Sequence, residues 1–204
     1  MIHLAKEDVR HTLGKFIVTA MGVGMLLGIV LIMMGVYRGM IVDAEVLLND
    51  INVDLWIVQQ GTLGPFAEAS RVHDDLQYTM QSVRGIAKSS IITFQNMQLP
   101  KKQGKIRVFA VGYDVFSTIN PINPERLISG RALKTDHYEI VVTDKTGFSL
   151  GDKVRLGRNM YTVVGITHGT VSSGGDLLIF ISIKDAQELQ FSYSNKRIQT
   201  DRAR

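Results

Sequence analysis

The stretch FIVTAMGVGMLLGIVLIMMGVY, residues 16–37, contains 22 consecutive residues without a charged side chain, between Lys15 and Arg38. A helix of that length extends roughly 33 Å at about 1.5 Å per residue, and a hydrocarbon core is about 30 Å thick. Each Leu, Ile, Val and Phe residue in the stretch favours insertion by roughly 0.3–0.6 kcal/mol. The sequence therefore predicts a transmembrane helix at residues 16–37.

A cleaved signal peptide and a soluble helix both fit this stretch less well. The apolar region of a signal peptide is about 7–15 residues long and ends at a small-residue cleavage site, whereas this stretch is longer and is followed by Arg38-Gly39-Met40-Ile41. A buried helix of a soluble protein normally keeps a polar face, and this stretch has none. We therefore expect an uncleaved membrane anchor.

The charges on either side of the span predict its orientation. Lys6, Arg10 and Lys15 precede the span, and only Arg38 lies in the matching stretch after it. Because Lys and Arg stay on the cytoplasmic side, we expect a cytoplasmic N-terminus and a main domain outside the cytoplasm. The chain contains no cysteine, which fits a bacterial periplasm at least as well as a disulfide-rich exterior. The expected location is the bacterial inner (plasma) membrane, with the main domain in the periplasm.

The span carries small residues four positions apart, at Ala20, Gly24 and Gly28. Small residues at this spacing let a second membrane helix approach closely, although glycine is also simply frequent in membrane helices. We expect this stripe to pack against transmembrane helices of a partner or of a second copy.

Short helical segments are expected on both sides of the span. Residues 1–15 form an amphipathic pattern typical of a helix lying on the cytoplasmic face of the membrane, with a frayed terminus as the alternative. Residues 38–52 continue the helical periodicity and are expected to form a helical stalk. The apolar face of this stalk contains Met40, Leu47, Leu48 and Ile51.

Residues 53–190 are expected to form a periplasmic core domain of mixed α/β structure, ending in a mostly β subdomain. The pattern predicts strands at residues 53–58, 86–94, 106–113, 139–143, 154–156, 161–166 and 177–183, and helices at residues 68–83 and 184–190. Residues 191–204 are a basic C-terminal segment. The expected fold class is α+β, with one N-terminal transmembrane helix, a helical stalk and this domain.

The sequence offers little for catalysis. It has no G-x-x-x-x-G-K-[ST] loop, so we do not expect it to hydrolyse ATP. His73, Asp74 and Asp75 would point in different directions on a helix, which favours a solvated face over a metal site. The net charge of +4 comes without a basic stripe interleaved with aromatic residues, which argues against nucleic-acid binding. We expect a protein that is not an enzyme and needs no cofactor or metal.

Three local sequences suggest a family. They are Asn123-Pro124-Glu125-Arg126-Leu127 with Ile128-Ser129-Gly130-Arg131, then Glu139-Ile140-Val141-Val142 with Leu150-Gly151-Asp152-Lys153-Val154, and finally Tyr161-Thr162-Val163-Val164-Gly165-Ile166. Their order after a single glycine-rich span resembles the N-terminal half of FtsX-like ABC transporter permeases of the MacB class. Each segment alone consists of ordinary turn and strand residues, and the order and spacing carry the resemblance.

The resemblance implies a permease subunit that works with a separate cytoplasmic ABC ATPase, other transmembrane helices, membrane lipid and a periplasmic adaptor protein. Such permeases couple ATP hydrolysis to motion of the periplasmic domain, for efflux, lipoprotein release or activation of a cell-wall hydrolase. The family carries three further spans after this domain. Because this sequence ends at Arg204 without them, we expect either part of a permease or a single-span relative. The alternative function is a membrane-anchored periplasmic binding or adaptor module that needs no ATPase.

Overall fold

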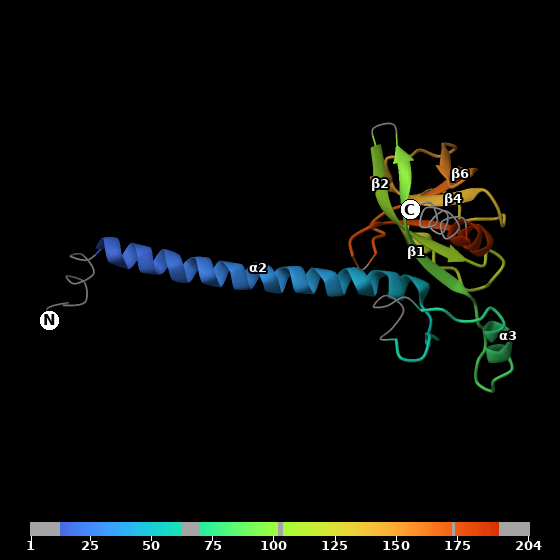
Figure 1. Ribbon diagram of the computed structural model, residues 1–204, viewed down its shortest axis with the longest axis horizontal. Helices are drawn as coiled ribbons and strands as arrows, with labels where there is room; N and C mark the ends of the chain where they lie inside the picture. Colours follow the sequence, from blue (N-terminus) through green and yellow to red (C-terminus); the bar gives the residue numbers. More distant parts are fainter. Residues whose placement is uncertain (1–12, 63–69, 102–103, 173, 192–204) are drawn as a thin grey trace, which may run out of the picture. The chain divides into compact units, whose positions relative to one another are not determined.

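The computed structural model describes residues 13–62, 70–101, 104–172 and 174–191. The chain divides into two compact units, residues 1–42 and 43–204. The predictions for residues 1–15 and 191–204 fall largely outside the described residues. Figure 1 shows the long helix α2, the sheet and the short helix α3.

Helix α2 (Leu13–Ile51) is one uninterrupted helix of 39 residues. Its apolar stretch makes it long and apolar enough to cross a membrane, and it is the one such helix among the described residues. None of the side chains described between Leu13 and Val42 is buried within the chain. An apolar surface of this extent is typical of a segment covered by lipid.

The second unit is built on a mixed seven-stranded sheet with the order β1-β2-β7-β4-β6-β3, and β5 pairs with β6. The strands are β1 (Ile92–Lys101), β2 (Gly104–Tyr113), β3 (Leu127–Gly130), β4 (Glu139–Thr143), β5 (Lys153–Leu156), β6 (Asn159–Thr167) and β7 (Leu177–Ser182). β2 pairs with β7 and β4 with β6 in parallel, and the other pairs are antiparallel. The fold is therefore α+β, as expected.

The central strands are buried on both faces, because successive side chains of a strand point to opposite sides. Ile140 and Val142 of β4 belong to one apolar cluster, whereas Val141 between them belongs to the other. The first cluster also contains Ala186 and Leu189 from the helix at residues 183–191. The second contains Ile51, the last residue of α2.

Most of the predicted strands are present, but the N-terminal part of the domain differs from the prediction. The strand predicted at residues 53–58 is absent, and the segment is irregular. The helix predicted at residues 68–83 is wrong over residues 70–75, because the described helix α3 is only Leu76–Gln81. The strand predicted to begin at residue 86 begins at Ile92. At residues 53–58, Val53 and Trp56 pack against the second apolar cluster without a ladder partner, and composition alone does not distinguish such a segment from a strand.

Gly112 on β2 allows the helix at residues 183–191 to approach the sheet closely. A Cβ atom at this position would lie 2.4 Å from Cβ of Ala186 and 2.5 Å from Oγ1 of Thr93. Both neighbours lie on elements that are already packed, so an added methyl group has no free space.

We predict that Gly112→Ala lowers the free energy of unfolding of the domain by about 1–3 kcal/mol, the usual cost of overpacking. Urea unfolding of the full chain in detergent, followed by near-UV circular dichroism, measures it. Gly174→Ala is the matched control, since its nearest new contact would be 3.8 Å away. Adding Ala186→Gly to Gly112→Ala should restore part of the loss. A Gly112→Ala variant as stable as the control would contradict this packing.

Candidate functional site

Helix α2 ends inside the second unit. Asn52 has the left-handed backbone conformation (φ 49°) that Asn tolerates at a helix end, and its amide donates to the carbonyl of Leu48 at 3.2 Å. Ile51 is 6% exposed and packs in the cluster with Val111 and Phe180 of the sheet. The last residue of the helix is therefore part of the domain core.

The residue before Ile51 is an acid whose side chain is also shielded from water. The Asp50 side chain is 6% exposed and pairs with Arg126, whose Nε lies 2.7 Å from Oδ2 and 2.9 Å from Oδ1. Asn123 adds a third contact, with its Nδ2 donating to Oδ1 at 3.2 Å. A carboxylate removed from water in this way needs charged and polar partners.

Both partners of Asp50 come from residues 120–126, which we call the socket loop. The loop is held in two turns, because Asn120 Oδ1 accepts from the amide of Ile122 at 2.9 Å and Asn123 Oδ1 accepts from the amide of Glu125 at 3.0 Å. Pro121 and Pro124 further restrict the backbone. Ile122, 3% exposed, belongs to the same cluster as Ile51. The socket loop thus supplies apolar and polar contacts to the helix end.

Arg126 also ties the socket loop to the turn after β6. The amide of His168 donates to the carbonyl of Arg126 at 2.8 Å, and Nη1 of Arg126 donates to the carbonyl of Gly169 at 3.4 Å. Gly169 has a left-handed backbone (φ 67°), and a Cβ there would lie 3.3 Å from Nη1 of Arg126.

Removing one partner from a buried ion pair costs about 3–5 kcal/mol. Because the Arg126 side chain is 31% exposed, we place Asp50–Arg126 at the lower end, about 3 kcal/mol.

A second Arg–carboxylate pair, Arg131–Glu139, follows the socket loop in the chain. Arg131 donates to both Glu139 oxygens, at 2.9 Å from Nη1 and 2.5 Å from Nη2, and the amide of Lys134 donates to Glu139 at 2.9 Å. The hydrogen bond from Arg131 is the main cause that lowers the pKa of Glu139 from its usual 4.5 to about 2, against the opposing effect of burial. Arg131 is thereby fixed to the start of β4.

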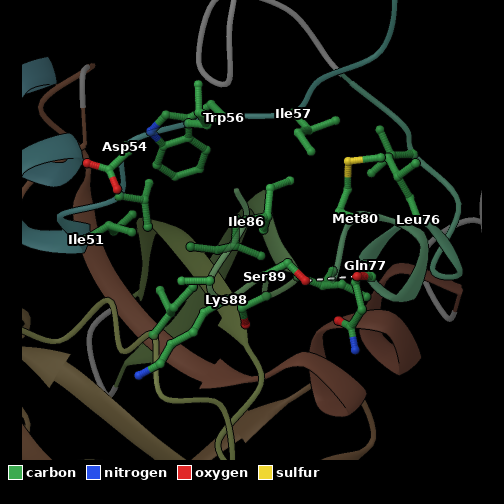
Figure 2. A pocket seen from close by; sticks show the side chains of 18 of the residues that line it. Ile51, Asp54, Trp56, Ile57, Leu76, Gln77, Met80, Ile86, Lys88 and Ser89 are labelled. Carbon is green, nitrogen blue, oxygen red and sulfur yellow. Dashed lines mark hydrogen bonds between the residues drawn. The ribbon is translucent and has the colours of Figure 1, made fainter. Parts of the chain in front are cut away.

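A pocket of about 490 Å³ lies beside the helix end. Figure 2 shows Trp56 and Ile57 on one wall, Leu76 and Met80 of α3 on another, and Ile86 between them. Ser89 Oγ donates to the carbonyl of Gln77 at 2.9 Å and fixes α3 to the segment before β1. None of the α3 side chains is buried. The lining is mainly apolar, as in sites for small apolar ligands or partner side chains.

The residues predicted for the stalk face have different surroundings. Met40 is 57% exposed, Leu48 is half-buried and Ile51 is buried. The side chain of Leu47 lies outside the described part of the structure. Of the predicted face, Ile51 is the residue found in the domain core.

The residues predicted for the helix-packing stripe stay open. Ala20 is exposed, and an added Cβ at Gly24 or Gly28 would meet no other atom within 4 Å. The chain itself therefore leaves room at these positions for another helix.

The histidines and acids among the described residues do not gather into a metal site. Within the described residues no group of three His, Asp or Glu side chains could hold a metal ion. His168 Nδ1 lies 2.6 Å from Oδ2 of Asp144 in an exposed pair, and Asp152 Oδ2 accepts from the amide of Ser149 at 2.8 Å, as a turn cap. These groups have local structural partners.

The sequence pattern did not indicate the cluster of Asp50, Asn123 and Arg126. Asn123 and Arg126 are 73 and 76 residues from Asp50 in the chain. The available signals were an acid directly before the last apolar residue of the stalk, and the N-P-E-R segment itself. Neither signal indicates the other as its partner.

A comparison with protein families matches the model of the MacB-like periplasmic core domain over residues 16–201. The chain belongs to this family. In this MacB-like chain, the N-P-E-R segment noted in the sequence is the part of the domain that receives the end of α2.

The MacB-like chain is similar to uncharacterized ABC transporter permeases of Mycobacterium bovis and Mycobacterium tuberculosis, each 23% identical over 94% of this chain and 54% of the relative. It therefore spans about half the length of these relatives. The extracellular domain of the ABC-type transporter YknZ from Gram-positive bacteria matches with a TM-score of 0.45 and 12% identity, over 56% of this chain and 64% of that one. The periplasmic region of MacB from Actinobacillus actinomycetemcomitans matches with a TM-score of 0.42 and 12% identity, over 57% of both chains.

The Arg131–Glu139 pair predicts an acid-dependent loss of stability. Because the folded-state pKa of Glu139 is lowered to about 2, its contribution is complete above the unfolded value of about 4.5 and is lost as the pH falls toward 2. We predict that Glu139→Gln lowers the free energy of unfolding by about 1–2 kcal/mol at pH 7. The variant should also flatten the fall in stability between about pH 5 and 2.

Urea unfolding of the full chain at a series of pH values measures both effects. Glu125→Gln is the matched control, since Glu125 is an exposed carboxylate in the socket loop. If Glu139→Gln and Glu125→Gln gave the same stability and the same pH dependence as the parent protein, the pair would have no such role.

Proposed function

We propose that this chain is the N-terminal part of the permease subunit of an ABC transporter in the bacterial inner membrane. Its N-terminus would be cytoplasmic and the domain that follows α2 periplasmic, as the basic residues before the span indicate. Membership of the MacB-like family and the similarity to ABC transporter permeases support this proposal. The transported material would be exported, or would be lipid or lipoprotein handled at the membrane.

The observation that carries the proposal is that the membrane-type helix α2 continues to Ile51, which is buried in the core of the second unit. An α-helix is stiff along its axis because each residue is hydrogen-bonded within it. A displacement imposed on the helix would therefore reach the domain without solute passing through the helix. The energy would come from ATP hydrolysis by a separate cytoplasmic ATPase, and the chain would act as a non-catalytic membrane subunit.

The proposal assigns roles to the residues predicted on α2. Ala20, Gly24 and Gly28 would pack against other transmembrane helices, of a partner permease or a second copy. The apolar face of the stalk would be formed by Met40, Leu47, Leu48 and Ile51. Of these, Ile51 packs in the core of the second unit. A periplasmic adaptor protein would contact the domain, and membrane lipid would cover the rest of the span.

A second candidate function is a membrane-anchored periplasmic binding or adaptor module. The pocket beside α3 favours it, since its apolar lining includes Trp56, Leu76 and Met80 and is of the size that small ligands occupy. Such a module would need no ATPase, and its span would serve only as an anchor.

Co-purification from native membranes tests the leading proposal. We predict that the tagged chain brings down a Walker-type ATPase and further permease spans. Gly24→Leu and Gly28→Leu should abolish this co-purification, because a large side chain prevents close helix approach, while the domain stays folded. Gly22→Leu is the matched control, since residue 22 lies on the opposite side of the helix from the stripe.

Two results would contradict the permease assignment. One is normal co-purification of partners with both Gly24→Leu and Gly28→Leu. The other is full function after exchange of residues 16–37 for an unrelated transmembrane anchor, which the binding module would tolerate and a permease would not.

A further inference from the structure

The socket loop does more than cover the end of α2, because it contacts it in two physically different ways. Ile122 and Ile51 share an apolar cluster, and apolar burial is non-directional. Such a contact fixes the depth of the helix end but leaves its rotation free. The contacts to Asp50 are hydrogen bonds, which require defined directions.

The geometry points to Asn123 and Arg126 as positioning residues that fix the orientation of the last turn of α2 relative to the sheet. Arg126 Nε lies 2.7 Å and 2.9 Å from the two Asp50 oxygens, and Asn123 Nδ2 lies 3.2 Å from one of them. Three contacts from two residues hold the carboxylate against rotation as well as translation. The use of this fixed orientation rests on the proposed function, in which the helix transmits a displacement.

The anchoring of both residues supports this role. Asn123 is held by the amide of Glu125, and the carbonyl of Arg126 is held by the amide of His168 in the turn after β6. Arg126 therefore connects Asp50 to the turn that follows β6. We call Asp50, Asn123 and Arg126 together the joint.

The Arg131–Glu139 pair is an internal comparison for the joint. It follows the socket loop in the chain and is also an Arg–carboxylate pair with one well-shielded acid, since the Glu139 side chain is 13% exposed. Both of its residues belong to the domain, so its loss should weaken the domain without changing the orientation of the helix. The two pairs separate a positioning role from a purely structural one.

Paired nitroxide labels on the full chain in lipid nanodiscs test the joint. Because the chain has no cysteine, Glu45→Cys on α2 and Arg155→Cys on β5, both exposed, give a unique pair of labels. We predict a single narrow distance distribution in the parent protein. Asp50→Asn and Arg126→Met should lose the narrow peak and give a broad distribution. Arg131→Met should lower the unfolding temperature while the peak stays narrow.

Narrow peaks retained in both Asp50→Asn and Arg126→Met would overturn the inference, as would equal broadening in Arg131→Met. Asn123→Ala removes one contact and no charge, so it supplies a mild variant if Arg126→Met does not fold, and it too should broaden the peak. The double variant Asp50→Asn with Arg126→Met should broaden it no further than either single change, because the two residues act as one unit.

The label experiment reads the joint without any partner protein, so it separates the two proposals. If the joint is intact but no ATPase co-purifies, the permease assignment is contradicted and the positioning role stands. If an ATPase co-purifies but the variants retain narrow peaks, the permease assignment stands and the positioning role of the joint is contradicted.

Discussion

The carboxylate of Asp50 is the constraint on which the proposed working of this chain depends. It is almost fully shielded from water at the end of a helix that begins in an apolar membrane-type segment. A shielded charge is stable only with partners in place, and Arg126 and Asn123 provide them from a loop held by its own turns and prolines. The requirement to satisfy one carboxylate therefore joins the helix, the socket loop and the turn after β6.

The sheet provides the rigid body to which this contact is fixed. Because β2, β4 and β7 are buried on both faces, the two apolar clusters share the same strands, and a movement of one face involves the other. The helix at residues 183–191 covers one face, with Gly112 allowing close approach, and the end of α2 enters the other. A small domain of this kind is suited to move as a whole.

Much of this architecture could be predicted from local sequence. Strand β5 lies where alternation and turn glycines place it, since Gly151 and Gly157 on either side have left-handed backbones (φ 82° and 60°) that favour glycine. The segment at residues 53–58 could not be predicted correctly, because Val53 and Trp56 pack against the second apolar cluster without a strand partner. The joint could not be predicted either: Asp50 and Arg126 are 76 residues apart, and nothing local in either segment identifies the other.

The central claim is that the last turn of α2 is part of the domain core. Hydrogen–deuterium exchange of the full chain in lipid nanodiscs tests it directly at the amides of residues 48–52. We predict that these amides exchange as slowly as those of β4, because opening them requires breaking the core around Ile51. Rapid exchange at residues 48–52 while β4 stays protected would show a frayed helix end and would contradict this claim.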